Sequence, residues 1–174
     1  LTYRRQNVAT LKVWDFFMLS AAKQVISLDS DILFFKRPSA LLADAPKNLF
    51  NRDLQYGYSL TLDEIEKYFG IRPQPMINSG LSRIARASLN YEKIETWLAN
   101  PKLFADKWVT EQTLHALCST IYGVDFLPEG YAVDTKPGLS EKTVCKHYPG
   151  FFRPLLYQEG MLKLEDMGFF EPQK

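Results

Sequence analysis

An α/β fold is predicted by three features: strand-length apolar runs, helical patterns between them, and a length that suits one layered domain. Residues 25–28 are a short Val/Ile/Leu run typical of a buried strand, and residues 11–23 before it follow a helical pattern. The 174 residues, 46% of them hydrophobic, are enough to bury a core. We therefore expect one domain over residues 1–174.

The other elements follow from local patterns along the chain. Thr61 and Glu64 form a capping-box pattern that opens a helix, and Gly70 is placed to end it. Residues 51–59 are expected to form a loop. A further strand is predicted through residue 35, then a helical turn over 39–42, a strand over 76–84, helices over 89–98 and 110–121, short strands over 124–127 and 143–145, and a weaker helix over 159–167.

The composition excludes several classes of partner. Lys and Arg number 21 against 20 Asp and Glu, and no basic block stands out, so no nucleic-acid partner is expected. No apolar run approaches membrane-spanning length. Cys118 and Cys145 are too few and too far apart to indicate a disulfide framework or a zinc site.

Two carboxylates, Asp29 and Asp31, follow the strand predicted over residues 25–28. If the extended geometry persists, both side chains point to the same side, at the sheet edge where α/β folds bind ligands. Carboxylates so close together repel each other unless a cation lies between them, which favours a divalent metal. A strand-end turn is an equal alternative, because Asp and Ser both favour turns.

Two enzyme classes place an Asp-x-Asp after a hydrophobic strand. In phosphatases of the haloacid-dehalogenase type the first Asp is the nucleophile, but their motif continues to a Thr where this chain has Leu33. The second class is the GT-A glycosyltransferases. Four further segments appear in the order of that second class: a helix bearing Lys12, Asn78-Ser79-Gly80, Glu111-Gln112, and the stretch from His147 to Pro154 with Gly150 and Arg153.

With these segments the chain resembles the family 8 glycosyltransferases, which include glycogenin-like and bacterial galactosyltransferase-like enzymes. The resemblance implies a GT-A fold, a Rossmann-like mixed sheet, and transfer of a hexose from a nucleotide diphosphate sugar, with UDP favoured, to an acceptor hydroxyl with retention. It implies metal ligation by Asp29, Asp31 and His147, for which Mn²⁺ is the better fit and Mg²⁺ the second choice. The implied donor-binding residues are Lys12, Asp29, Asn78, Ser79, Gly80, Gly150 and Arg153, and the implied catalytic residues are Glu111, Gln112 and Arg153.

Three positions depart from the family pattern. Arg153 stands where Lys is usual, which keeps a cation for phosphate. Leu155 stands where Trp is expected, and Glu111 replaces Asp and adds a methylene group. These departures leave open a catalytically degenerate sugar-nucleotide-binding or interaction domain.

Most of the proposed site residues also have a purely structural interpretation. His147 is also read as a hydrogen-bonded residue at a strand end, and Lys12 as a solvated helix residue. Asn78 suits a strand end, and Glu111 lies in the first turn of a helix, where capping favours an acid. His115, one turn later, is expected to serve packing or to lie on the surface.

The resemblance also sets an expectation about the start of the chain. Members of the family have βα units before the helix that bears Lys12, and one such unit with its next strand takes roughly 30 residues or more. The chain begins at Leu1, close to that helix. We expect an N-terminally truncated, partial GT-A domain, with an open sheet edge where the missing strands belong and poor activity of the isolated chain.

Overall fold

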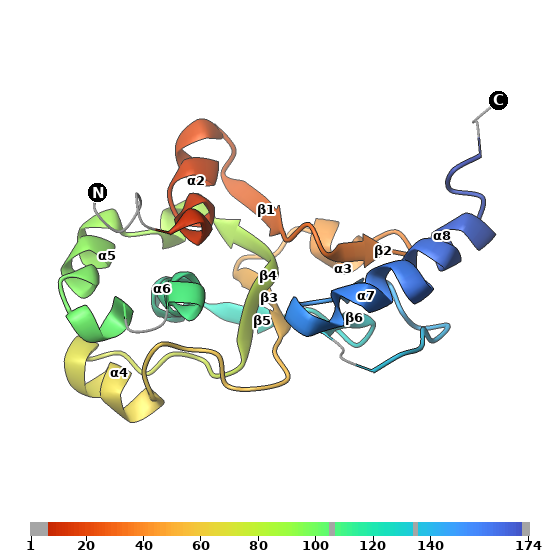
Figure 1. Ribbon diagram of the computed structural model, residues 1–174. Helices are drawn as coiled ribbons and strands as arrows, with labels where there is room; N and C mark the ends of the chain where they lie inside the picture. Colours follow the sequence, from red (N-terminus) through yellow and green to blue (C-terminus); the bar gives the residue numbers. More distant parts are fainter. Residues whose placement is uncertain (1–6, 105–106, 134–135, 172–174) are drawn as a thin grey trace.

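The computed structural model describes residues 7–104, 107–133 and 136–171, which form two mixed β-sheets surrounded by helices (Figure 1). The four-stranded sheet has the order β1 (Gln24–Leu28), β4 (Ile77–Ala85), β3 (Asn48–Arg52), β5 (Val124–Phe126). Its β1/β4 and β4/β3 pairs are antiparallel, and its β3/β5 pair is parallel. These mixed sheets confirm the α/β class.

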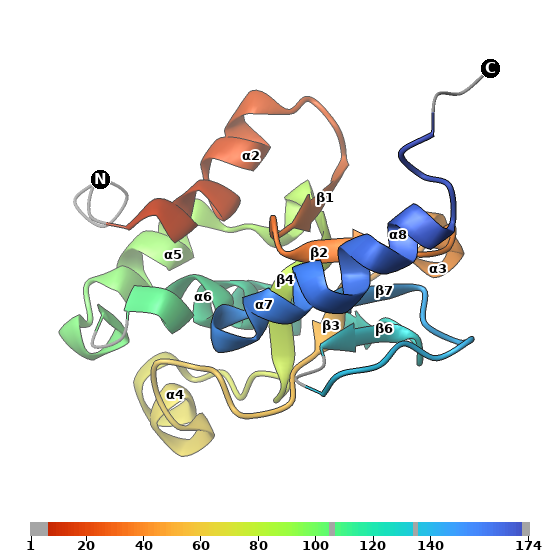
Figure 2. The ribbon, with the colours of Figure 1, turned by 45° about the vertical axis from the view of Figure 1, so that its right-hand side comes forward.

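The second sheet is smaller and has the order β2 (Ile32–Phe34), β7 (Cys145–His147), β6 (Tyr131–Val133). Its β2/β7 pair is antiparallel and its β6/β7 pair is parallel. The helical chain that begins at α7 runs across this sheet toward the C-terminus (Figure 2). The sheet therefore brings the stretch after β1 and the stretch after β7 to neighbouring positions.

The helices vary in length and type. The longest is α6 (Lys107–Tyr122), which packs on the four-stranded sheet through a core that includes Phe50, Ile77 and Leu114. The others are η1 (Val8–Lys12), α2 (Asp15–Leu19), α3 (Ser39–Leu42), α4 (Leu62–Phe69), η2 (Arg86–Ser88), α5 (Tyr91–Leu98), η3 (Pro101–Phe104), η4 (Gly150–Phe152), α7 (Arg153–Leu155), the π-helix η5 (Leu156–Met161) and α8 (Leu162–Asp166).

The predicted caps of α4 are confirmed. The Thr61 side chain accepts from the Glu64 backbone N–H, and the Glu64 side chain accepts from the Thr61 backbone N–H. Gly70 ends the helix with φ +67°, a left-handed conformation that favours glycine. Local sequence chemistry therefore sets both ends of this helix.

The helix expected over residues 11–23 is wrong as a single element. Two short helices, η1 and α2, take its place, and the chain leaves the second at Ser20, whose hydroxyl accepts from the Ala22 N–H at 3.1 Å. Met18 and Leu19 are 64% and 86% exposed, so their apolar character does not reflect burial within the described residues. The hydroxyl of Ser20 offers the backbone an alternative to helical bonding.

The loop expected over residues 51–59 begins too early, because β3 extends to Arg52. The polar residues Asn51 and Arg52 favour a loop, but both belong to this central strand. Asn48 is fully buried, and its amide donates to the hydroxyls of Ser88 and Ser119 while its carbonyl accepts from the Ala85 N–H. Buried polar groups are tolerated when they are bonded in this way. The strand expected over residues 143–145 instead spans β7, and the last helix begins before residue 159.

A break in register in β4 shapes the middle of the larger sheet. Phe50 pairs with Ser82, but the next residue of β3 pairs with Asn78, so three residues of β4 bulge between them. Within this bulge, Ser79 bonds to side chains of α6, while a Cβ on Gly80 would meet the ring of His147. The bulge thus joins α6 to the end of β7.

The outer edge of β1 has no strand partner among the residues that the structure describes. Ile26 and Leu28 on this strand are 39% and 49% exposed. In the described ranges no helix combines the length and apolar character needed to cross a membrane.

Candidate metal centre

The turn between β1 and β2 carries both carboxylates, and the main chain holds each end of it. The Asp29 N–H donates to the Gly80 carbonyl at 2.8 Å, and the Tyr148 N–H donates to the Asp31 carbonyl at 2.9 Å. β4 therefore fixes the first aspartate, and the segment after β7 fixes the second. Because both ends of the turn are held in this way, the chain passes within three residues, 29–31, from β1 in one sheet to β2 in the other.

His147 joins the two aspartates because β7 pairs with β2. In the register of that pair His147 lies opposite Ile32, directly after Asp31. Its Nε2 lies 3.2 Å from Asp31 Oδ1 and 3.7 Å from Asp29 Oδ2, and one ligand atom from each of the three residues lies within 4.8 Å of the others. Residues separated by more than a hundred positions in sequence therefore converge on one point.

The spacing of these atoms fits a shared cation. Ligands at about 2.1 Å from a metal lie about 3.0 Å apart in an octahedral site and about 3.4 Å apart in a tetrahedral one. Asp31 Oδ1 is buried and accepts no hydrogen bond from the described part of the chain, although His147 Nε2 is 3.2 Å away. Carboxylate oxygens with an imidazole nitrogen suit Mn²⁺.

Two cations hold the remaining carboxylate oxygens. Lys12 Nζ lies 2.5 Å from Asp29 Oδ1, and Arg153 Nε donates to Asp31 Oδ2 at 2.9 Å. Although burial opposes it, the nearby His147 and Arg153 side chains lower the pKa of Asp31 to about 2. Burial likewise acts to lower the pKa of Lys12, but the negative charges of Glu111 and Asp29 raise it. Asp31 is thus held as an anion, and each aspartate has one oxygen near His147 Nε2.

Gly80 makes room for the histidine ring. A Cβ at this position would meet the His147 imidazole, with Nδ1 only 2.8 Å away, and would lie 2.9 Å from Asn78 Oδ1. The backbone of β4 can therefore approach β7 this closely only at a residue without a side chain. The side-chain Oδ1 of Asn78 accepts from the Gly80 N–H at 3.0 Å and keeps the bulge in place.

The amides of Asn78 and Gln112 meet at Asp53, which the sequence analysis missed. Asn78 Nδ2 and Gln112 Nε2 lie 3.0 and 3.4 Å from Asp53 Oδ2. Gln112 also donates to the Gly57 carbonyl and accepts from the Ser79 N–H, so its amide is fully bonded within the protein. Asp53 directly follows β3, and recognising that strand would have placed this acid at the same sheet edge.

Glu111 lies on the other side of the β4 bulge. Its Oε2 accepts from the Ser79 hydroxyl at 2.9 Å, and its Oε1 lies 3.1 Å from His115 Nε2. Glu111 is 3% exposed, so its carboxylate faces the interior and not solvent. The expected surface or packing role of His115 is incomplete, because the ring is buried beside a carboxylate.

Gly150 begins the turn that brings Arg153 back to Asp31. Its φ is +56°, and it opens η4 directly after Pro149. The structure thus gives Gly150 a backbone role and places the guanidinium, which is largely exposed, at the rim of the carboxylate cluster.

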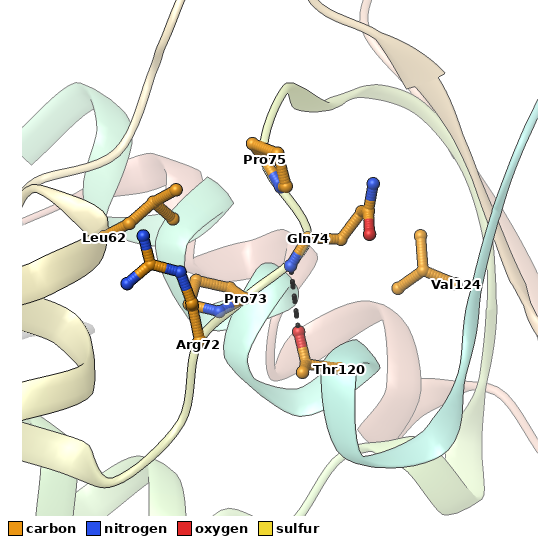
Figure 3. A pocket seen from close by; sticks show the side chains of 7 residues that line it. All are labelled: Leu62, Arg72, Pro73, Gln74, Pro75, Thr120 and Val124. Carbon is orange, nitrogen blue, oxygen red and sulfur yellow. Dashed lines mark hydrogen bonds between the residues drawn. The ribbon is translucent and has the colours of Figure 1, made fainter.

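A separate pocket lies between α4 and the end of α6 (Figure 3). Its volume is about 390 Å³, and it is lined by Leu62, Arg72, Pro73, Gln74, Pro75, Thr120 and Val124. Arg72 already pairs with Asp63 and Glu66 at 2.8 and 2.6 Å, which balances its charge. The Gln74 N–H donates to the Thr120 hydroxyl at 3.3 Å. The pocket therefore offers little free charge to a ligand.

Comparison with known proteins does not place the chain: no family model matches it, and no curated protein or solved structure matches it closely enough to count as related. The functional argument therefore rests on the geometry of the carboxylate cluster.

Proposed function

We propose that the chain is a metal-dependent glycosyltransferase that moves a hexose from a nucleotide diphosphate sugar, preferably a UDP-sugar, to an acceptor hydroxyl. The observation that carries this proposal is the convergence of Asp29, Asp31 and His147, with Lys12 and Arg153 on the outer carboxylate oxygens. The sequence resemblance to family 8 glycosyltransferases supports the same residues and adds retention of configuration.

The number of ligands supports a substrate-binding metal. Asp29, Asp31 and His147 each offer one atom, which leaves open positions around an octahedral ion, and catalytic sites keep such positions while structural sites are closed. A divalent ion bound there would act as a Lewis acid on the oxygens of a leaving diphosphate. Mn²⁺ suits this mixed nitrogen and oxygen set, with Mg²⁺ as the second choice.

The balance of charge supports an anionic substrate. Two carboxylates and the two cations Lys12 and Arg153 sum to zero, so a divalent ion leaves two uncompensated positive charges. A diphosphate brings the opposite charge. Arg153 is 65% exposed at its side chain, so its guanidinium is accessible to a phosphate once a metal competes for Asp31.

The roles of the remaining donor-site residues belong to the same proposal. We assign Asn78, Ser79 and Gly80 to the wall that faces the donor sugar. Glu111 and Gln112 support this wall from behind through Ser79. From there the negative charge of Glu111 steadies the positive charge that develops on the sugar as the diphosphate leaves.

Two alternatives make different predictions. A dehalogenase-type phosphatase requires Asp29 as a nucleophile and would hydrolyse simple phosphoesters. A degenerate sugar-nucleotide-binding domain would bind the donor without turnover.

The test is a screen of UDP-sugars for Mn²⁺-dependent hydrolysis and for transfer to simple sugar acceptors, with the protein as encoded in full. We expect hydrolysis of at least one UDP-hexose, loss of activity with chelator, and recovery with Mn²⁺. Binding of UDP without turnover would favour the degenerate domain. Hydrolysis of a generic phosphoester that sugar nucleotides do not inhibit would favour the phosphatase.

A further inference from the structure

A buried pair of titratable side chains lies beneath the candidate site on α6. His115 and Glu111 are one helical turn apart, and their side chains are 1% and 4% exposed. His115 Nε2 lies 3.1 Å from Glu111 Oε1, and the Ser79 hydroxyl donates to Oε2 at 2.9 Å. A buried carboxylate is costly without polar partners. The Ser79 hydroxyl supplies a hydrogen bond to Oε2, and the His115 imidazole supplies a close polar contact to Oε1, which accepts no hydrogen bond from the described residues.

Among the described residues, the only polar contact of the His115 ring is the one between its Nε2 and Glu111. The imidazole packs near the Phe50 ring, with the ring centroids 6.5 Å apart. Its Nδ1 has no hydrogen-bond partner in the described ranges, so Nε2 is the nitrogen that faces a polar atom. An apolar side chain would fill this space at less cost if packing were the only requirement. The contact with Glu111 accounts for a histidine here.

Glu111 connects this pair to the carboxylate cluster. Its charge is the largest influence that raises the pKa of Lys12 against the effect of burial. Lys12 in turn contacts Asp29 at 2.5 Å. The groups that face the Glu111 carboxylate are therefore Lys12 from η1, Ser79 from β4 and His115 from its own helix. Charges alternate from Glu111 through Lys12 to Asp29.

We propose that His115 is a positioning residue that holds Glu111 as an ionised carboxylate between Ser79 and Lys12. Through Glu111 it keeps the Lys12 ammonium directed at Asp29. The importance of this arrangement for catalysis rests on the proposed glycosyltransferase function, but the state of Glu111 is measurable without turnover.

Removal of His115 has a predictable sign. Burial acts to raise the pKa of Glu111, but His115, Lys12 and Ser79 together lower it. Without His115 the effect of burial is less opposed, so the pKa of Glu111 rises and the carboxylate takes up a proton at higher pH. If activity requires ionised Glu111, the acid limb of the pH–activity profile then moves to higher pH.

Two substitutions separate positioning from packing. His115→Leu keeps an apolar side chain of similar size but removes the nitrogen that faces Glu111. His115→Gln keeps an amide nitrogen near the place of Nε2 but cannot take up a proton. The ¹³C signal of the Glu111 carboxyl, identified by its loss in Glu111→Gln, reports its titration directly.

We expect the Glu111 midpoint to lie at higher pH in His115→Leu than in the wild type, with His115→Gln between them. Equal midpoints in all three proteins would overturn the proposal. If the leucine variant does not fold, the glutamine variant carries the test, because an amide stabilises the carboxylate less well than an imidazole. A wild-type midpoint in His115→Gln would then overturn it.

Mn²⁺-dependent hydrolysis of a UDP-hexose supplies the second measurement. Partners that orient a site's ligands typically contribute 10- to 100-fold, so we expect kcat of His115→Leu to fall by about that factor, with a smaller change in KM. The acid limb of its pH profile should move upward, and His115→Gln should recover part of the loss. An unchanged acid limb would overturn the catalytic importance of His115. Absence of hydrolysis in the wild type would instead count against the glycosyltransferase function, while the ¹³C titration still decides the role of His115.

Discussion

Replacing Asp31 with asparagine tests the metal centre most directly, because the two side chains have the same shape and differ in charge. Asp31 Oδ1 is the buried oxygen that faces His147 without accepting a hydrogen bond from the described residues. Its other oxygen accepts from Arg153 at 2.9 Å. The substitution therefore removes one anionic ligand and also leaves the guanidinium without its carboxylate partner.

Both consequences weaken cation binding. A neutral amide is a poorer ligand than a carboxylate, and an unpaired Arg153 repels a divalent ion. Loss of a residue that merely orients a ligand costs about 10- to 100-fold in metal affinity. Loss of a ligand should reach at least the upper end of this range, 100-fold, which is about 2.8 kcal/mol at about 1.4 kcal/mol for each tenfold change.

The measurement is a titration with Mn²⁺, with free ion followed by electron paramagnetic resonance. A matched control is Asp125→Asn on β5, because Asp125 also pairs with a cation, Lys47 at 3.0 Å, but lies half-exposed and outside the carboxylate cluster. We expect wild type and control to bind alike and Asp31→Asn to bind at least 100-fold more weakly. Equal Mn²⁺ affinity in Asp31→Asn and wild type would refute the metal centre.

Three other predictions concern neighbouring features. Gly80→Ala should lower Mn²⁺ affinity and destabilise the fold by roughly 1–3 kcal/mol, because its Cβ meets the His147 ring; calorimetry with and without Mn²⁺ checks both effects. Arg153→Ala should weaken UDP binding more than Arg153→Lys, which keeps the charge but not the planar fork, and equal UDP affinity in wild type and Arg153→Ala would remove it from the site. In the metal-free protein the pKa of Asp31, about 2 against an ordinary 3.8, contributes about 2 kcal/mol that is present above pH 4 and lost as pH falls toward 2. Acid unfolding of Asp31→Asn should lack this component.

The sequence predicted the positions of the two aspartates better than their approach to His147. Asp29 and Asp31 follow a regular apolar strand, and a local pattern was enough to locate them. Their approach to His147 depends on the pairing of β2 with β7, which no local pattern encodes. Only the order of short motifs, taken as a resemblance to a family, indicated that the histidine belongs with the aspartates.

The missed features have a common physical cause, which is polar side chains placed inside the protein or close to its core. Asn51 and Arg52 were expected to begin a loop, but both belong to β3, where Asn51 is fully buried. Asp53 was overlooked because it follows that strand. His115 was assigned to packing or the surface because its partner is a buried carboxylate one turn away. In each case the tertiary structure places a polar residue in a position that its local preference for a loop or for the surface does not predict.

The double role of the two cations leads to a last prediction, that metal and diphosphate bind cooperatively. Without a metal, Lys12 and Arg153 neutralise Asp29 and Asp31, so neither cation is free for phosphate. A bound divalent ion competes for the same carboxylates and repels both cations, which makes them available to an anion. Mn²⁺ should therefore raise the affinity for UDP, and UDP should raise the affinity for Mn²⁺ by the same factor, as linkage requires. Calorimetric titrations in both orders measure the two factors. UDP affinity that does not change with Mn²⁺ would show that the cations are not shared in this way, and Asp31→Asn, with Arg153 already released, should bind UDP with less dependence on the metal.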